Sequence, residues 1–422
     1  MKVTLVYVGI GVAGFNANRP LGEREGGWVP HGIASVAASA QAAGYRVDMV
    51  DLRQLGGWED FRKIVAESPA DVYGLSVSPV DAWSALKTII LIKKTAPNSK
   101  IVVGGIHPTI FPGEYDYKAV DCVVQGEGEV TFVEVLNAFR DGKPVKKFIR
   151  GTKPDLDKIP WISRELFDYQ KELHCNFIPE QPRPSITMLA GRGCPFECQY
   201  CQGAENAVFG KPYRLRSAQN VVDEMVALKK RHDYRSVTFW DDTFTFNRKW
   251  VREFCDLYEQ SGIKAPIAAC SRADIICNNE GMVERLAEIG VICLVIGFES
   301  GSQRLLDLIK KGTTVEQNLE AARICHKYGI KVFATFMYGL PTETEAESLA
   351  TAKMIDAAAP EYPSPFWFLP IKGTGLYDYC KEHDLILPGV EDRTIARTGT
   401  FNPTLKNVNY DYIEKLMKGY RG

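Results

Sequence analysis

The chain has 422 residues, of which 45% are hydrophobic and 24% charged, and its formal net charge at pH 7 is −1. This length is enough for about two or three domains. The balanced charge excludes the basic footprint of a nucleic-acid-binding protein, and no apolar run approaches the ~18 residues that suit a membrane span. The segment Met1–Val8 predicts a strand and not a signal helix, so we expect a cytoplasmic protein with reduced thiols.

Short β-branched runs alternate with helical patterns from the first residue to about residue 140. Strands are predicted at 2–8, 46–50, 72–76, 100–104 and 121–124, and helices at 30–43, 58–67, 82–95 and 129–140. Such alternation predicts an α/β domain with a doubly wound parallel sheet, similar to a Rossmann fold. A sheet of this kind binds its ligands at the carboxyl ends of its strands.

The run Gly9–Gly14 after the first strand fits the dinucleotide-binding pattern G-x-G-x-x-G. We reject this interpretation because the pattern requires a helix that begins at the glycines. The sequence instead predicts a loop from Phe15 to Val29 and a helix only from about Pro30. The first acidic residue at the end of the second strand, Asp51, also lies beyond the ~20 residues expected for a ribose-binding carboxylate.

Three loops at strand carboxyl ends carry small or acidic residues: Ser76 after the third strand, Gly104 and Gly105 after the fourth, and Glu127 after the fifth. Small residues there let a large flat ligand approach the backbone. In these positions residues 1–145 resemble the cobalamin-binding domain that precedes many radical S-adenosylmethionine (SAM) domains. The resemblance implies that Ser76, Gly104 and Gly105 receive the nucleotide tail of cobalamin and that Glu127 lies near the corrin. The alternative is a related sheet that no longer binds cofactor.

One feature of some cobalamin domains is missing. The chain has no Asp-x-His-x-x-Gly run to supply a histidine to cobalt, and His31 and His107 lie outside any such motif. We therefore expect a cobalt ion without a histidine beneath it.

Residues 146–184 are predicted to be a linker, because prolines such as Pro154 and Pro160 interrupt both neighbouring patterns. A second alternation then spans residues 185–370. Strands are predicted at 186–190, 236–240, 267–270, 291–297, 332–337 and 365–369, and helices at 218–232, 247–261, 279–289, 302–310, 315–328 and 344–358. Six such units predict a (β/α)6 partial barrel whose chemistry lies at the strand carboxyl ends. Residues 371–422 would form a short C-terminal extension.

Cys194, Cys198 and Cys201 form a C-x3-C-x2-C triplet directly after the first barrel strand. An iron–sulfur cube normally takes one thiolate on each of its four irons, so three ligands leave one iron open. A structural zinc site would need a second Cys/His pair, and the nearest cysteines, Cys175 and Cys255, stand alone. A disulfide framework is disfavoured by the odd count of 11 scattered cysteines. The other cysteines are predicted to be small buried hydrophobic residues, with Cys175 the least certain.

The triplet matches the signature of the radical SAM superfamily, in which the open iron binds SAM. The runs Ile296–Ser302, Lys311–Thr314 and Gly339–Thr344 follow in the order found in that family. The resemblance implies a [4Fe–4S] cluster on the three cysteines and SAM contacts at the barrel strand ends. The implied contacts are Tyr200, Arg272 and Glu299, with Asp241 as a weaker one. For each residue the alternative is a helix cap or a barrel-end hydrogen bond. Lys310 and Lys311 are predicted to be a solvated helix end.

The resemblance implies an enzyme that cleaves SAM reductively to a 5′-deoxyadenosyl radical and, with cobalamin, methylates an unactivated carbon. A cyclase, a ring-rearranging enzyme or a carbon–carbon coupling enzyme with the same cofactors is one alternative. An iron–sulfur scaffold or sensor without turnover is another, from a different class. The expected partners are a small-molecule or peptide substrate and an electron donor such as flavodoxin or ferredoxin. The sequence predicts no substrate identity.

Overall fold

The computed structural model describes residues 1–15, 29–167, 173, 178–390 and 403–420. The chain forms two compact units, one comprising most residues up to about 175 and the other most of the remainder. Within the described ranges, no helix is both long and apolar enough to cross a membrane.

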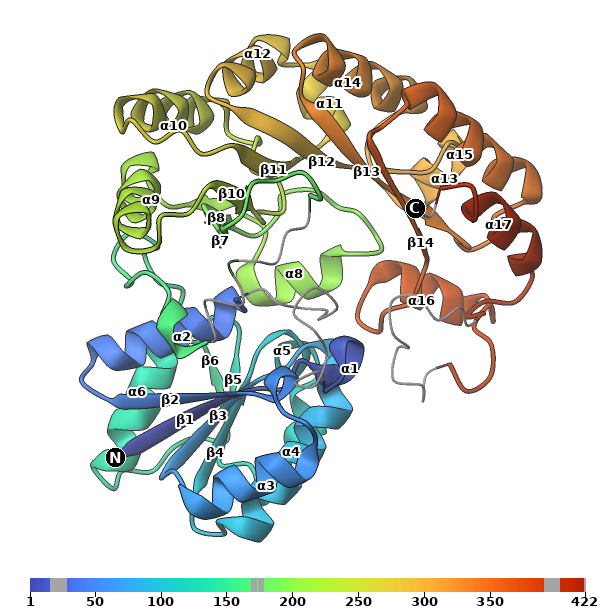
Figure 1. The fold of residues 1–422 in the computed structure, drawn as a ribbon. Coiled ribbons are helices and arrows are strands. Elements are labelled where there is room, and N and C mark those ends of the chain that lie inside the picture. Colours follow the sequence, from blue (N-terminus) through green and yellow to red (C-terminus); the bar gives the residue numbers. More distant parts are fainter. Residues whose placement is uncertain (16–28, 168–172, 174–177, 391–402, 421–422) are drawn as a thin grey trace. The chain divides into compact units, whose positions relative to one another are not determined.

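The first unit is built on a six-stranded parallel sheet (Figure 1). The strand order is β2-β1-β3-β4-β5-β6. The strands are β1 (Lys2–Tyr7), β2 (Arg46–Asp51), β3 (Val72–Ser76), β4 (Lys100–Gly104), β5 (Cys122–Gln125) and β6 (Phe148–Arg150). Five of them were predicted from the sequence. The sixth was missed because it has only three residues, none of them buried, and the sequence placed it in the linker.

Helices cover both faces of this sheet. The helices α2 (His31–Ala42) and α6 (Glu129–Arg140) pack together on one face, and α3 (Trp58–Glu67) and α4 (Ala82–Thr95) pack together on the other (Figure 1). Branched residues of β1, β3 and β4, such as Val6, Leu75 and Val103, are buried between the layers. The predicted doubly wound α/β fold is confirmed.

Several short elements were not predicted in this unit. A one-turn helix, α1 (Ile10–Ala13), begins within the glycine run, although the sequence predicted a helix only from about Pro30. Most of the predicted loop from Phe15 to Val29 falls on residues 16–28, outside the described ranges. The other short elements are α5 (Ile106–Ile110) and 3-10 turns at Leu52–Gln54, Pro79–Asp81, Pro112–Tyr115 and Arg164–Leu166.

The second unit contains the other six-stranded parallel sheet. Its order is β14-β13-β12-β11-β10-β7, so each successive strand of the sheet adds to the same edge. The strands are β7 (Ser185–Met188), β10 (Ser236–Phe239), β11 (Ile267–Ser271), β12 (Val291–Glu299), β13 (Lys331–Tyr338) and β14 (Tyr362–Trp367). All six were predicted, and their order is that of a partial barrel.

The helices of this unit follow the sheet along one side (Figure 1). They are α9 (Ala218–His232), α10 (Arg248–Gln260), α12 (Glu280–Glu288), α13 (Gln303–Leu308), α14 (Val315–Lys327) and α15 (Glu345–Ala358). The helix α10 illustrates why they form. The Asn247 side chain caps its first turn, and Trp250, Phe254 and Tyr258 form a buried stripe at helical spacing.

The remaining elements of the second unit are short. A two-stranded antiparallel pair joins β8 to β9 on either side of the cysteine loop and α8. These elements are β8 (Gly191–Arg192), β9 (Arg214–Leu215), α11 (Ala273–Cys277), α16 (Gly375–Glu382) and α17 (Tyr410–Met417), whereas most of α8 (Gln202–Phe209) belongs to the first unit. Of the second unit's elements, α17 is the last in the chain. The last of these packs on α15, so the C-terminal extension is part of the folded unit.

Candidate functional site

The cysteine loop begins directly after β8, on the chain segment that follows the first barrel strand. Cys198 is buried, Cys194 is half-buried and Cys201 is exposed, and none of the three forms a disulfide. In the described part of the chain, no three Cys, His, Asp or Glu side chains lie close enough to hold one metal ion. Each thiolate of an iron–sulfur cube binds a different iron, so its ligands need not meet at one point. The donor set of three thiols on one loop, none of them in a disulfide, fits such a cube.

Asp241, two residues beyond β10, holds the chain that leads into this loop. Its carboxylate accepts hydrogen bonds from the backbone N–H groups of Ala190, at 3.0 Å, and of Gly191, at 2.5 Å. The hydroxyl of Tyr213 lies 3.3 Å from the same carboxylate. Burial raises the pKa of Asp241 to about 7, although the two amide donors act in the opposite direction. These contacts make Asp241 an anchor of the segment before Cys194, and its contact with SAM stays a prediction.

Replacing Asp241 by Asn is expected to destabilise the barrel unit by about 1–3 kcal/mol, because a buried carboxylate that accepts from two amides would lose part of its accepting capacity. Chemical denaturation followed by circular dichroism would measure the loss. The matched control is Asp242→Asn at the exposed neighbouring position, where we expect a change within about 0.5 kcal/mol. Equal effects of the two substitutions would contradict the anchoring role.

Arg272 directly follows β11 and is only 5% exposed. Its Nε donates to Asp274 at 3.0 Å, and its Nη2 donates to the backbone carbonyl of Lys311 at 2.7 Å. Its Nη1 lies 3.7 Å from the sulfur of Cys198, and its guanidinium carbon lies 3.5 Å from the ring centre of Phe196. An arginine has five N–H donors, so the described contacts leave donors for a further acceptor such as a carboxylate.

Glu299 ends β12 in a left-handed backbone conformation, with φ of 64°. Its Oε1 accepts hydrogen bonds from the Tyr200 hydroxyl and from the Lys311 ammonium, each at 2.9 Å. Its Oε2 is buried and has no hydrogen-bond partner among the described residues. An unpaired buried carboxylate oxygen is unfavourable, so it fits a ligand that donates hydrogen bonds, such as the ammonium group or a ribose hydroxyl of SAM.

The sequence predicted that Lys310 and Lys311 form a solvated helix end, and for Lys311 this prediction is wrong. Lys310 is exposed as expected, but Lys311 is only 6% exposed and pairs with Glu299. The chain turns inward here because Lys310 and Gly312 both have positive φ, at 48° and 71°. The glycine after Lys311 was the available sequence signal. Tyr213 beside Asp241 was also missed, and no local pattern marks it.

In the first unit, the predicted cobalamin contacts gather at one edge of the sheet. Ser76, Gly104 and Glu127 stand at or just beyond the carboxyl ends of β3, β4 and β5. A Cβ atom added to Gly104 would lie 3.4 Å from the Val124 carbonyl oxygen, an ordinary contact. Gly105 differs, because its φ is 102° and an added Cβ would lie 2.7 Å from the backbone of Val77. The glycine at 105 is therefore required by the protein's own packing, whichever ligand binds.

Hydrogen bonds connect the loops after β1 and β3. The strand order reverses between these two strands, and ligands of such sheets usually bind at this position. The Gly11 N–H donates to Asp81 at 2.9 Å, and the Ser78 hydroxyl donates to the same carboxylate at 2.6 Å. A side chain at Gly11 would overlap the Val80 carbonyl oxygen. The run Gly9–Gly14 resembled a dinucleotide-binding motif, but the glycine at position 11 is explained by the close packing of the α1 turn against Val80. Burial raises the pKa of Asp81.

His107 is not placed as an open ligand. His107 is 6% exposed; its Nδ1 lies 2.8 Å from the Tyr115 hydroxyl and its Nε2 lies 3.5 Å from Glu114. His31 is the first residue of α2. Both ring nitrogens of His107 are therefore engaged with protein groups.

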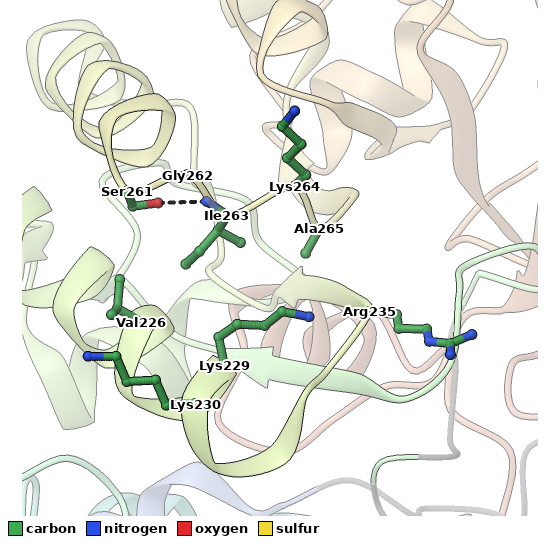
Figure 2. A pocket seen from close by; sticks show the side chains of 9 residues that line it. All are labelled: Val226, Lys229, Lys230, Arg235, Ser261, Gly262, Ile263, Lys264 and Ala265. Carbon is green, nitrogen blue, oxygen red and sulfur yellow. Dashed lines mark hydrogen bonds between the residues drawn. The ribbon is translucent and has the colours of Figure 1, made fainter.

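A separate hollow lies at the opposite end of β10 and β11 from the cysteine loop (Figure 2). It is lined by basic side chains, namely Lys229, Lys230, Arg235 and Lys264. Figure 2 shows that the ends of Lys230, Lys264 and Arg235 point in different directions. Barrels place their chemistry at strand carboxyl ends, so this hollow is not the candidate site.

Two protein-family models match the chain, one in each unit. Residues 188–355 match the radical SAM superfamily, and residues 20–136 match the B12 binding domain. The first match includes the cysteine triplet, Asp241, Arg272 and Glu299. The second includes Ser76, Gly104, Gly105 and Glu127.

Individual relatives cover nearly all of the chain. An uncharacterized methyltransferase of Pyrococcus horikoshii is 28% identical over 92% of this chain and 86% of its own. An anaerobic magnesium-protoporphyrin IX monomethyl ester cyclase of Rubrivivax gelatinosus is 29% identical over 79% of this chain and 62% of its own. Among solved structures, the radical S-adenosylmethionine methyltransferase TsrM of Kitasatospora setae has a similar fold. Its TM-score is 0.68 at 17% identity, with coverage of 92% of this chain and 77% of the other.

Proposed function

We propose that the protein methylates an unactivated carbon with cobalamin as cofactor, because residues 188–355 match the radical SAM superfamily and residues 20–136 match the B12 binding domain. The two domains imply a [4Fe–4S] cluster, SAM and cobalamin as cofactors. The observation that carries the proposal is the match of both units together, over 92% of the chain, to a methyltransferase. A cytidylyl-2-hydroxyethylphosphonate methyltransferase of Streptomyces wedmorensis, 25% identical over 85% of the chain, supports it further.

Each cofactor has candidate residues in this chain. Cys194, Cys198 and Cys201 would hold the cluster. Arg272 would bind the carboxylate of SAM through its remaining donors, and Glu299 would accept from SAM through the unpaired Oε2. When bound, these cofactors supply a 5′-deoxyadenosyl radical and a transferable methyl group, while the protein positions the reactants and excludes water. The further proposed contacts are Tyr200 and Asp241 for SAM, and Ser76, Gly104, Gly105 and Glu127 for cobalamin.

The proposed substrate is a small organic molecule. TsrM has been solved with tryptophan as substrate. In this chain, Phe366 on β14 is 40% exposed, which offers aromatic surface to such a molecule. We further propose a cytoplasmic location and a flavodoxin or ferredoxin as electron donor.

A cyclase is the second candidate, because the relative in Rubrivivax gelatinosus is a cyclase with 29% identity. A methyl-labelled substrate search separates the two. Enzyme loaded with all three cofactors would be incubated with SAM carrying a deuterated methyl group and a fractionated small-molecule extract. Methylation predicts a compound that gains the label. A new product without label, formed together with 5′-deoxyadenosine, would favour the cyclase. No SAM cleavage under any condition would favour a scaffold.

The bound cobalamin is expected to lack a protein nitrogen beneath its cobalt, because both nitrogens of His107 are engaged with Tyr115 and Glu114. In the cobalt(II) state, the electron paramagnetic resonance spectrum should show no superhyperfine splitting from an axial protein nitrogen. A triplet splitting that disappears on His107→Phe or His31→Phe would contradict this expectation. It would also favour polar methyl transfer over radical methylation.

A further inference from the structure

Two buried cations contact the cysteine loop from outside it. Arg272 follows β11 and Lys311 follows α13, and they are 5% and 6% exposed. A buried cation is unfavourable unless it is paired or hydrogen-bonded. Both are paired, with Asp274 and Glu299 respectively. From the sequence, Arg272 was predicted to contact SAM and Lys311 to be solvated. Neither was predicted to contact the cysteine loop.

Arg272 contacts the first half of the loop at two points. Its guanidinium stacks on Phe196, which lies between Cys194 and Cys198, and its Nη1 lies 3.7 Å from the Cys198 sulfur. Its carboxylate partner, Asp274, has a side chain that is 21% exposed, so water screens that partner more than it screens Arg272. A positive charge therefore remains close to the Cys198 sulfur.

Lys311 contacts the second half of the loop. Its ammonium lies 3.1 Å from the hydroxyl of Tyr200, the residue before Cys201, and 2.9 Å from Glu299. Its backbone carbonyl accepts the hydrogen bond from Arg272 at 2.7 Å. The two cations thus form one connected network that touches the loop at Phe196, Cys198 and Tyr200.

We propose that Arg272 and Lys311 are positioning residues for the iron–sulfur cluster, and that both cations raise the reduction potential of the cluster. Reduction adds negative charge, which a hydrogen bond to a ligating sulfur and a nearby cation both stabilise. The network also holds the loop in place before the cluster is assembled. This inference rests on the proposed function, because it takes the three cysteines as cluster ligands.

The test is a redox titration of the reconstituted protein without SAM or substrate, followed by electron paramagnetic resonance. Arg272→Gln should lower the equilibrium constant for cluster reduction at least about tenfold, which is about 59 mV for one electron. Arg272→Lys, which keeps the charge, should stay closer to the wild type. The matched control is Arg285→Gln, at an arginine that pairs with Asp256, Glu259 and Glu288 on the outer helices.

An unchanged potential in Arg272→Gln would overturn the proposal. If Arg272→Gln folds like the wild type by circular dichroism but holds no iron, the positioning role is supported. The effect of charge on the reduction potential is then measured in the Lys311→Gln variant. Lys311→Gln leaves Glu299 unbalanced beside Tyr200 and should also lower the potential, so a wild-type value there would overturn the proposal. A wild-type chain that loads the cluster but methylates nothing would refute the proposed function alone.

Discussion

Alanine at Cys194, Cys198 and Cys201 together is expected to reduce iron bound after anaerobic reconstitution to background and to abolish reductive cleavage of SAM. The physical reason is that nothing would replace these ligands, because the described part of the chain contains no group of three Cys, His, Asp or Glu side chains placed to hold a metal ion. Iron and sulfide analysis and the amount of 5′-deoxyadenosine would measure both losses. Circular dichroism should change little, because the loop contributes few helical residues.

The matched control for this variant is Cys255→Ala. Cys255 is fully buried on α10, outside the loop. Its replacement should lower stability by about 1 kcal/mol through a small cavity and leave iron content unchanged. A triple variant that still cleaves SAM reductively would contradict the assignment of the three cysteines.

Gly104→Leu is expected to abolish cobalamin binding to the first unit. Gly104 ends β4 at the edge where ligands of such sheets bind, and a long side chain there would occupy the space proposed for the nucleotide tail. Cobalamin retained after gel filtration, measured by its visible absorption, would report binding. Cluster content should remain at the wild-type level, because the cysteines belong to the other unit.

Gly104→Ala is the control for folding, since the added Cβ would make only an ordinary contact with Val124. It should fold normally and bind cobalamin with a modest loss of affinity. A Gly104→Leu protein that folds and still binds cobalamin like the wild type would contradict the placement of the tail. A wild-type protein that takes up no cobalamin at all would favour a domain that has lost its cofactor.

The strands could be predicted because parallel strands buried on both faces leave continuous apolar runs in the sequence. Runs such as Val291–Phe298 are readable without tertiary information. The strand β6 and the turn α1 have three and four residues, and so short an element leaves no periodic pattern. The strand β6 pairs with β5, and the α1 turn is linked to Asp81 by the hydrogen bond from Gly11.

The candidate site could be predicted only in part. The cysteine triplet and the strand ends are local features, and the sequence indicated them. The roles of Arg272 and Lys311 depend on partners that are distant in the chain, since Arg272 and Cys198 are 74 residues apart and Lys311 and Tyr200 are 111 residues apart. A lysine at a helix end is usually solvated. The glycine at position 312 indicates a turn but not its direction, so the burial of Lys311 was seen only in the folded structure.

The proposed chemistry would be decided by measuring two products in one reaction, once a substrate that becomes methylated is known. These products are S-adenosylhomocysteine and 5′-deoxyadenosine. Radical methylation consumes one SAM as methyl donor and one as radical source. We predict equal amounts of the two products, and loss of the methylated product when the enzyme is prepared without cobalamin. Formation of 5′-deoxyadenosine without S-adenosylhomocysteine, or methylation that persists without cobalamin, would contradict a cobalamin-dependent radical methyltransferase.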